Sequence, residues 1–213
     1  MNTVTSIEGQ LGRKSRVNVF LDGAYSFSLS HPLATEFGLH VGQTLSPAEL
    51  EGLDRSDLLG RCLKSALRYL QPRPRSEAEI EIRLRRFGFD ADIIQQTLAK
   101  LRAQGLVNDV AFAEFWRENR ENFRPRSRRA LEMELRQKGI DAETVAEAVA
   151  PIDDELSAYR AAQRKARSLA RLDYPDFRRR LGTFLRRRGF AFELIHHTVD
   201  QVWRERTGCP PNL

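Results

Sequence analysis

The chain has 213 residues, of which 41% are hydrophobic and 30% are charged, a composition that fits one or two folded domains and excludes a fully disordered chain. No run approaches the roughly 18 to 20 apolar residues of a membrane span, and the first residues lack the pattern of a signal peptide, so we expect a cytoplasmic protein. The two cysteines, Cys62 and Cys209, have no Cys or His at metal spacing, which argues against a disulfide framework or a zinc site.

Charge is distributed unevenly along the chain. Residues 1–57 carry four basic and seven acidic residues, whereas residues 58–213 carry 31 basic and 22 acidic ones. A net charge of +9 on the longer part predicts that it meets a polyanion or an acidic surface. Thirty of the 35 basic residues are arginine, which grips phosphate or carboxylate with two nitrogens, although genome composition also produces such a bias.

The segment 1–57 is predicted to form a small β-hairpin domain with short helices. Asp22-Gly23 separates two alternating runs, 17–21 and 24–29, and Asp-Gly favours a hairpin turn in which both residues have positive φ. Val17, Val19 and Leu21 should share one face, as should Tyr25, Phe27 and Leu29, and the run 4–11 could supply a third strand. A short helix over 32–37 should end at Gly38, and Ser46-Pro47-Ala48-Glu49 is typical of a helix start.

A repeated unit of about 50 residues fills the rest of the chain. Residues 73–101 and 124–152 are identical at 11 of 29 positions, and a third copy lies 50 residues further on. In each copy, two apolar residues four positions apart are followed by a glycine, which predicts an amphipathic helix that ends at that glycine. These positions are Ile80, Leu84 and Gly88; Leu131, Leu135 and Gly139; and Leu181, Leu185 and Gly189.

A second helix should follow each glycine, with an apolar residue packing back on the helix just ended. Phe89, Ile140 and Phe190 fill that apolar position. Asp90 and Asp141 are predicted N-caps, and Ala191, which stands there in the third copy, should start its helix less firmly, by about 1 kcal/mol.

A further helix should precede each pair, over about 59–70, 109–122 and 154–171. The sequence therefore predicts a mainly α protein, with three three-helix repeats in an elongated tandem array after the small N-terminal domain. We place the repeats at residues 58–107, 108–153 and 154–207, and a tail at 208–213. The linkers 71–74 and 123–125 contain prolines, which break helices.

Arginines recur at two places in the repeats, the interhelix turns and the ends of the helices that follow. Cations in a last helical turn offset the helix dipole, which explains the second group without a ligand. The turn arginines have no such explanation and lie where helix N-termini would reinforce anion contact, so both a binding and a structural role stay open for them. The candidate binding residues are Arg73, Arg75, Arg124, Arg126, Arg128 and Arg129 in the turns, with Arg186, Arg187 and Arg188 at a helix end.

No motif of an enzyme or of a cofactor or metal site is present. The sequence lacks a phosphate loop, a His-Glu-x-x-His motif and a Gly-x-Ser-x-Gly motif. His196 and His197 are adjacent on a predicted helix and cannot face one metal together, and Asp153-Asp154 is better explained by helix capping than by acid-base chemistry. The aromatic residues fall at core spacing and are interpreted as packing rather than base stacking, namely Phe87, Phe89, Phe112, Phe115, Trp116, Phe184 and Phe190.

The order and spacing of these motifs resemble the RecX family, bacterial regulators of RecA recombinase. The likeness spans roughly residues 60–205, and the hairpin segment looks like the N-terminal extension of some members. Ser127 departs from the pattern, since the family often has a glycine there. The resemblance is carried by Tyr69-Leu70, Arg75-Ser76, Glu79-Ile80, Leu84, Gly88-Phe89, Leu101, residues 105–109 (GLVND), Phe112-Ala113, residues 134–140 (ELRQKGI) and residues 184–190 (FLRRRGF).

The resemblance implies a non-catalytic, cofactor-free negative modulator, expected as a monomer. RecX-like proteins bind the RecA filament on DNA, obstruct its growth and lower its ATP hydrolysis, strand exchange and coprotease activity in DNA repair and the SOS response. Direct contact with single- or double-stranded DNA is compatible with this role. A simple sequence-independent DNA-binding protein is the alternative, because the positive charge of residues 58–213 suffices for weak association.

Overall fold

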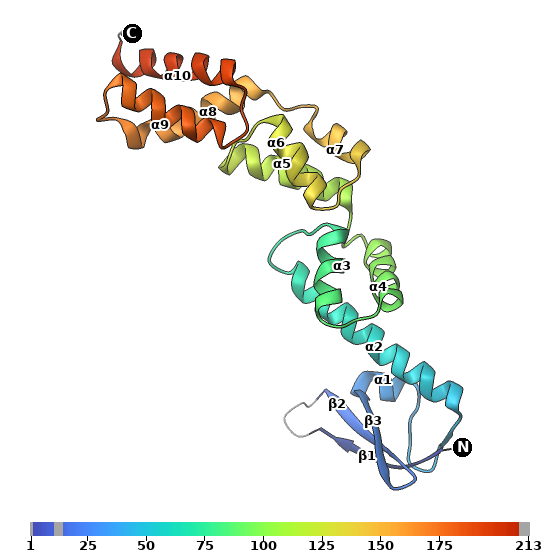
Figure 1. Cartoon of the computed structure of the whole chain (residues 1–213). Coiled ribbons are helices and arrows are strands. Elements are labelled where there is room, and N and C mark those ends of the chain that lie inside the picture. Colours follow the sequence, from blue (N-terminus) through green and yellow to red (C-terminus); the bar gives the residue numbers. More distant parts are fainter. Residues whose placement is uncertain (1, 11–14, 209–213) are drawn as a thin grey trace. The chain divides into compact units, whose positions relative to one another are not determined.

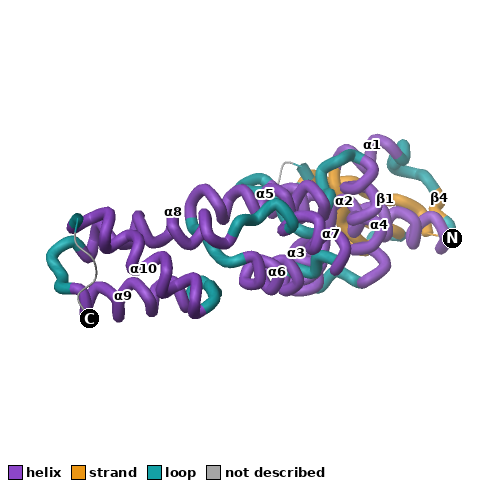
Figure 2. Tube along the Cα trace, turned by 90° about the horizontal axis from the view of Figure 1, so that it is seen from above, coloured by secondary structure: helices purple, strands orange, loops and turns teal. Residues whose placement is uncertain are grey.

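The computed structural model describes residues 2–10 and 15–208 and divides into two compact units. The first contains residues up to Arg73 together with Ile80–Gln104, and the second contains Pro74–Glu79 and the chain from Gly105 onward. The strands fall within residues 2–45, and most of the later chain is helical (Figure 2). Cys209 and the predicted tail beyond Gly208 lie outside the described residues.

A four-stranded antiparallel sheet opens the first unit. Its strands are β1 (Asn2–Gly9), β2 (Arg16–Leu21), β3 (Ala24–Ser30) and β4 (Thr44–Leu45), in the order β3-β2-β1-β4. Asp22 and Gly23 both have positive φ, 49° and 83°, so the predicted hairpin turn and the third strand are confirmed, whereas β4 was not predicted.

One face of the sheet is buried, with Val17, Val19 and Leu21 inside as predicted. Tyr25 is an exception, because the pairing of β2 with β3 shifts register between Val19 and Phe20. The irregularity moves Tyr25 out of line with Leu29, and its ring lies exposed against Phe20 instead of in the core.

Two helices follow the sheet, α1 (His31–Glu36) and α2 (Pro47–Leu70). Ser46 and Glu49 form the expected capping box at the start of α2. The predicted helix start near residue 59 is wrong, because α2 runs unbroken for 24 residues from the sheet to the first repeat (Figure 1). It crosses the predicted domain limit after residue 57, and the limits of the domains stay predictions.

The two halves of α2 pack on different partners. Leu53 enters the core of the sheet, and the Asp57 carboxylate accepts hydrogen bonds from Arg16 at 2.9 Å and from the Ser30 amide at 3.0 Å. Cys62 and Ala66, further along, are buried on the half that packs against α4. No residue between 47 and 70 ends the helix, since proline occurs there only at its first turn.

The three repeats have the predicted three-helix composition. The first combines the end of α2 with α3 (Glu77–Arg86) and α4 (Ala91–Ala103); the second has α5 (Asp109–Phe123), α6 (Arg128–Gln137) and α7 (Ala142–Val149). The third has α8 (Asp154–Ala166), a 3-10 turn at Arg167–Leu169, α9 (Tyr174–Arg186) and α10 (Phe192–Thr207). The paired apolar positions of α3, α6 and α9 are all buried, as predicted.

A glycine ends each middle helix in the same way. Gly88, Gly139 and Gly189 have φ of 81°, 80° and 89°, the left-handed region in which glycine carries no steric penalty. The amide that follows Gly139 donates back to the Leu135 carbonyl at 3.2 Å, and the other two copies repeat this bond. The predicted helix stop is therefore confirmed.

Two smaller predictions need correction. Asp90 stands at the N-cap of α4 but its side chain makes no capping hydrogen bond, whereas Asp141 caps α7 by accepting from the Thr144 amide. Phe87 is not core: its ring is exposed and the Arg83 guanidinium lies 4.4 Å from its centre. Position 87 follows α3 directly, at the turn, where the helical apolar stripe no longer applies.

Two junctions of the same construction lie within the second unit. At the first, Ser76 Oγ donates to the Lys138 carbonyl at 2.6 Å, and the Glu77 amide donates to Asp109 at 2.9 Å. At the second, the Ser127 amide donates to the Arg188 carbonyl at 3.1 Å, and the Arg128 amide donates to Asp154 at 2.7 Å. Each junction thus joins the start of one middle helix to the glycine turn of the next middle helix and to an acid at the start of the first helix of the next repeat.

Candidate functional site

A hollow of about 380 Å³ lies beside the second junction, between α6 and the turn that ends α9. Four of the predicted arginines meet there: Arg126 from the turn before α6 and Arg129 from its first turn, with Arg186 and Arg187 from the end of α9. Because the two pairs are 57 to 61 residues apart in sequence, the stacking of the repeats brings them together. The lining of the hollow also includes Ala130, Met133, Glu134, Gln137 and Gly189.

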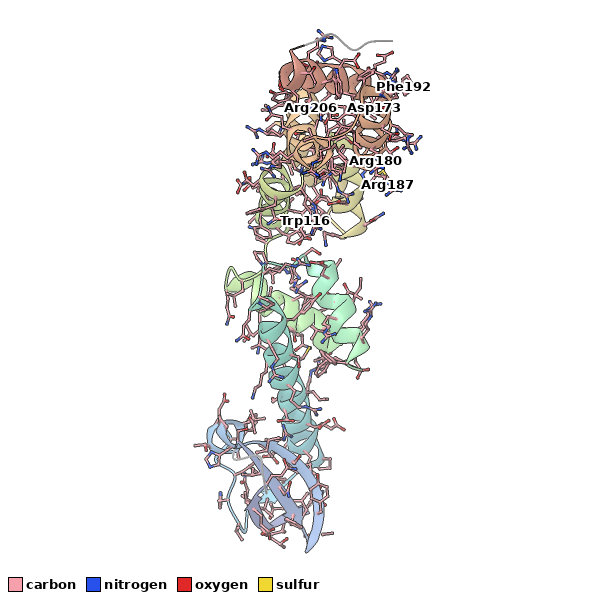
Figure 3. All side chains as sticks on the ribbon, turned by 90° about the vertical axis from the view of Figure 1, so that its left-hand side faces the viewer. Trp116, Asp173, Arg180, Arg187, Phe192 and Arg206 are labelled. Atoms are coloured by element: carbon pink, nitrogen blue, oxygen red, sulfur yellow. The ribbon has the colours of Figure 1, made fainter. Side chains whose placement is uncertain are left out.

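The hollow combines charge with an apolar surface. Met133 is 54% exposed, and the turn beside it ends in Gly189, which has no side chain. Arg129, Arg186 and Arg187 are exposed as well, so their guanidinium groups are accessible to a partner. Figure 3 shows Arg187 on the third repeat and Trp116 on the second. Such a surface suits an anionic partner that also offers some apolar contact.

Glu134 organises one side of the hollow. Its carboxylate accepts hydrogen bonds from Trp116 Nε1 at 2.8 Å and from Arg120 Nε at 2.7 Å, and pairs with Arg126 at 2.8 Å. The side chain is only 15% exposed, so water screens these interactions weakly. Glu134 therefore fixes Arg126 while leaving the arginines on the other side without that carboxylate.

Arg188 stands between two residues of the hollow, Arg187 and Gly189, and contacts the turn between α5 and α6. It donates from Nη1 to the Pro125 carbonyl at 2.8 Å, and its guanidinium stacks 4.4 Å from the centre of the Phe184 ring. Burial lowers the pKa of the Arg188 guanidinium from its usual value, and the like charges of four nearby arginines lower it further. These neighbours are Arg126, Arg124, Arg120 and Arg164.

We call these five residues, Arg120, Arg124, Arg126, Arg164 and Arg188, the arginine cluster. Arg164 of α8 donates to the Asn122 carbonyl at 2.7 Å, so Arg164 holds the last turn of α5 and Arg188 holds the turn that follows it, each through a backbone carbonyl. Sequence reasoning missed Arg120 and Arg164. They lie in the last turns of α5 and α8, where the helix dipole by itself explains a cation, and only the tertiary packing turns them toward the turn arginines.

The other predicted arginines have different surroundings. Arg128 donates to the carbonyls of Ala150 and Ile152, at 3.4 and 2.6 Å, and so ties α6 to the chain before α8. Arg73 and Arg75 are half-buried, each already has an interaction partner, and neither lines the hollow. A binding role for these three residues stays a prediction.

We also searched the described part of the chain for metal-binding groups and membrane-spanning helices. Residues 2–10 and 15–208 contain no group of three His, Cys, Asp or Glu placed to hold a metal ion. His196 receives a contact from Arg178 at 3.0 Å, and Asp153 caps α8 as predicted. Among the same residues, none of the helices is both long and apolar enough to span a membrane.

Comparison with protein families decides the identity of the fold. The model for the RecX N-terminal domain matches residues 2–46, and those for the first, second and third RecX three-helix domains match 62–101, 108–149 and 153–199. The chain belongs to the RecX family. The four matches follow the sequence order of the sheet and the three repeats, so the resemblance inferred from the motifs is confirmed.

Several relatives bear the name Regulatory protein RecX. One from Listeria monocytogenes serotype 4b (strain F2365) is 29% identical over 205 residues, covering 95% of this chain and 76% of the relative. One from Bacillus pumilus is 27% identical over 95% of this chain and 78% of its own length. One from Clostridium botulinum is 26% identical over 95% and 97%.

Solved RecX structures share the fold. A crystal structure of regulatory protein RecX is similar with a TM-score of 0.63 and 24% identity, covering 97% of this chain and 94% of that one. The crystal structure of RecX from Lactobacillus salivarius has a TM-score of 0.56 and 23% identity, over 69% of this chain and 97% of that one. At this identity, the likeness establishes the fold alone.

Proposed function

We propose that this RecX protein is a negative modulator of RecA recombinase that binds the RecA filament on DNA. In this role it inhibits filament growth, ATP hydrolysis, strand exchange and coprotease activity, and so acts in DNA repair and the SOS response. It works by binding, not by catalysis. The family membership supports the choice of partner, and the observation that carries the proposal is the arginine-lined hollow at the second junction.

The hollow supplies the type of contact that this role requires. Its exposed arginines, Arg129, Arg186 and Arg187, steer the protein toward a negatively charged nucleoprotein surface, and Met133 adds apolar contact once it has docked. Contacts from several repeats at once would raise the affinity beyond that of one site. Since exposed charges are screened by salt, inhibition should weaken as the ionic strength rises.

A sequence-independent DNA-binding protein remains the second candidate. The observation in its favour is the excess of arginine at the second junction, where, within residues 2–10 and 15–208, Glu134 is the one acid that pairs with the arginine cluster. A titration with DNA alone and with DNA-bound RecA separates the two candidates. Equal affinity for both would favour the simple DNA binder.

The direct test measures the DNA-dependent ATP turnover of RecA with increasing amounts of this protein. The double variant Arg129→Ala/Arg187→Ala should need about tenfold more protein for half-inhibition, corresponding to roughly 0.7 kcal/mol for each exposed contact. Its helicity and melting temperature should remain those of the wild type, because exposed charges seldom affect stability much.

A matched control removes two exposed arginines elsewhere in the third repeat, Arg171→Ala/Arg204→Ala, and should leave inhibition unchanged. Arg128→Ala serves as a structural comparison, since it breaks bonds to two carbonyls and should lower the melting temperature. The proposal fails if wild type, double variant and control inhibit equally, or if wild type does not inhibit at all.

A further inference from the structure

The two junctions differ in whether a carboxylate neutralises the cation at the glycine turn, which is Lys138 after α6 and Arg188 after α9. At the first, Lys138 Nζ pairs with Glu79 at 2.7 Å, and both side chains are mostly buried. At the second, Arg188 takes the position of Lys138, and Ala130 takes the position of Glu79. The second junction therefore keeps the cation and lacks the carboxylate that neutralises it at the first.

More positive charge is concentrated around Arg188 instead. The four other members of the arginine cluster lie close enough to act on it electrostatically, and they come from α5, the 124–127 turn and α8. Glu134 pairs with two of the five, Arg120 and Arg126. Like charges held together at a partly buried place destabilise one another unless an anion joins them.

Two guanidinium groups of the cluster are also held by one nitrogen each, so that the rest of each group stays available. Arg188 uses Nη1 for the Pro125 carbonyl and Arg164 uses Nη1 for the Asn122 carbonyl, which fixes one side chain at the turn after α5 and the other at the end of that helix. Arg124, at the end of α5, is exposed beside them. Guanidinium groups fixed in this way form a preorganised site, since an arriving anion need not order them.

We propose that the arginine cluster at the end of α5 and the turn after it is a binding site for the phosphate groups of a nucleic-acid strand. The inference deepens the proposed function, on which it rests for its biological setting, by assigning the nucleic acid in the filament to a specific turn. Arginine suits this ligand because its planar fork donates two parallel hydrogen bonds to phosphate oxygens.

A strand fits better than a single anion or an acidic protein segment. Arg126 belongs both to the cluster and to the lining of the hollow, so the basic surface continues to Arg129, Arg186 and Arg187. A phosphodiester chain carries a negative charge at every nucleotide and can follow such a continuous surface. Bound phosphate would also replace the missing carboxylate, so binding should stabilise the second junction.

The first experiment needs no recombinase and therefore separates this inference from the proposed function. The full-length protein is melted in sodium pyrophosphate and in sodium chloride at equal ionic strength and pH. The wild type should melt at a higher temperature in pyrophosphate. The variant Arg124→Gln/Arg164→Gln should lose most of that difference, while Arg171→Gln/Arg204→Gln, which removes the same charge elsewhere, should keep it.

The second experiment identifies the ligand class. Binding of a fluorescent single-stranded oligodeoxynucleotide is measured at several salt concentrations, with polyglutamate as competitor. A plot of the logarithm of the binding constant against the logarithm of the salt concentration has a negative slope. Its magnitude should be smaller by about 1.4 in Arg124→Gln/Arg164→Gln than in the wild type, roughly 0.7 for each lost contact with a single strand.

An unchanged slope, or equal melting of the wild type in both salts, would overturn the inference. Polyglutamate that displaces the oligonucleotide at equal charge concentration would show that the cluster recognises an acidic protein instead. If pyrophosphate and DNA bind as expected but ATP turnover by RecA is unaffected, the phosphate site stands and the proposed function fails.

Discussion

The two junctions share one backbone design and differ in charge. In both, a buried serine caps a middle helix and hydrogen bonds join it to the glycine turn of the following middle helix, through Lys138 in one case and Arg188 in the other. The first is neutralised by the Glu79–Lys138 pair, and the second is crowded with arginines. Small residues and backbone groups therefore set how these helices meet, which leaves the charged residues free to differ.

The largest effect on stability should come from adding a side chain at the glycine turns. A Cβ at Gly139 would lie 2.3 Å from Ala78 Cβ, whereas a Cβ at Gly88 would meet nothing within 4 Å, although both glycines have φ near 80°. We expect Gly139→Ala to lower the free energy of unfolding by about 3 kcal/mol and Gly88→Ala by about 1 kcal/mol. Urea denaturation followed by circular dichroism measures both, and equal losses would contradict close packing at the junction.

An intermediate effect is expected from the ion pair of the first junction. Glu79→Gln keeps the size of the side chain but leaves the Lys138 ammonium without its counter-ion, which should cost about 2 kcal/mol. The variant Arg124→Gln/Arg164→Gln at the second junction should cost less, because it relieves repulsion while it removes one bond to the turn. Melting temperatures at low and high salt test the contrast, which fails if the second variant is the more destabilised.

The smallest effect concerns pH at the first junction. Burial raises the pKa of the Asp109 carboxyl; the Glu77 amide opposes the rise, and the Asp141 charge adds to it. A raised pKa means that the folded state favours the protonated acid, so this contribution to stability is present at low pH and is lost as the pH rises through the folded pKa.

Asp109→Asn removes this titration and can still accept from the Glu77 amide. As the pH rises from below 3.8, the ordinary pKa of this carboxyl, the free energy of unfolding of the variant should therefore increase relative to that of the wild type. Denaturation at a series of pH values checks this, and a difference that stays constant with pH would rule out a titrating Asp109.

Much of the fold could be predicted from local chemistry. The Asp22-Gly23 turn, the three glycine stops and the buried Leu84, Leu135 and Leu185 follow from conformational preference and spacing alone. The errors have tertiary causes. A register shift in the sheet exposed Tyr25, and packing on two different partners kept α2 continuous where the sequence predicted two helices.

The candidate site was predicted only in part. The turn and helix-end arginines were visible because they recur with the repeat, yet nothing local separates Arg128, whose side chain bonds to two carbonyls, from Arg129, which lines the hollow. Arg120 and Arg164 carried no distinct signal, since they lie in the last turns of α5 and α8, where the helix dipole explains a cation without a ligand.

The sequence by itself determined the RecX repeats, the helix ends and the positive charge of the longer part, because these depend on backbone preference, periodicity and composition. Only the tertiary structure decided which arginines gather at the second junction and that one of them is partly buried among four others. Charge acts through distance and burial, and both are set by how helices far apart in the chain pack together.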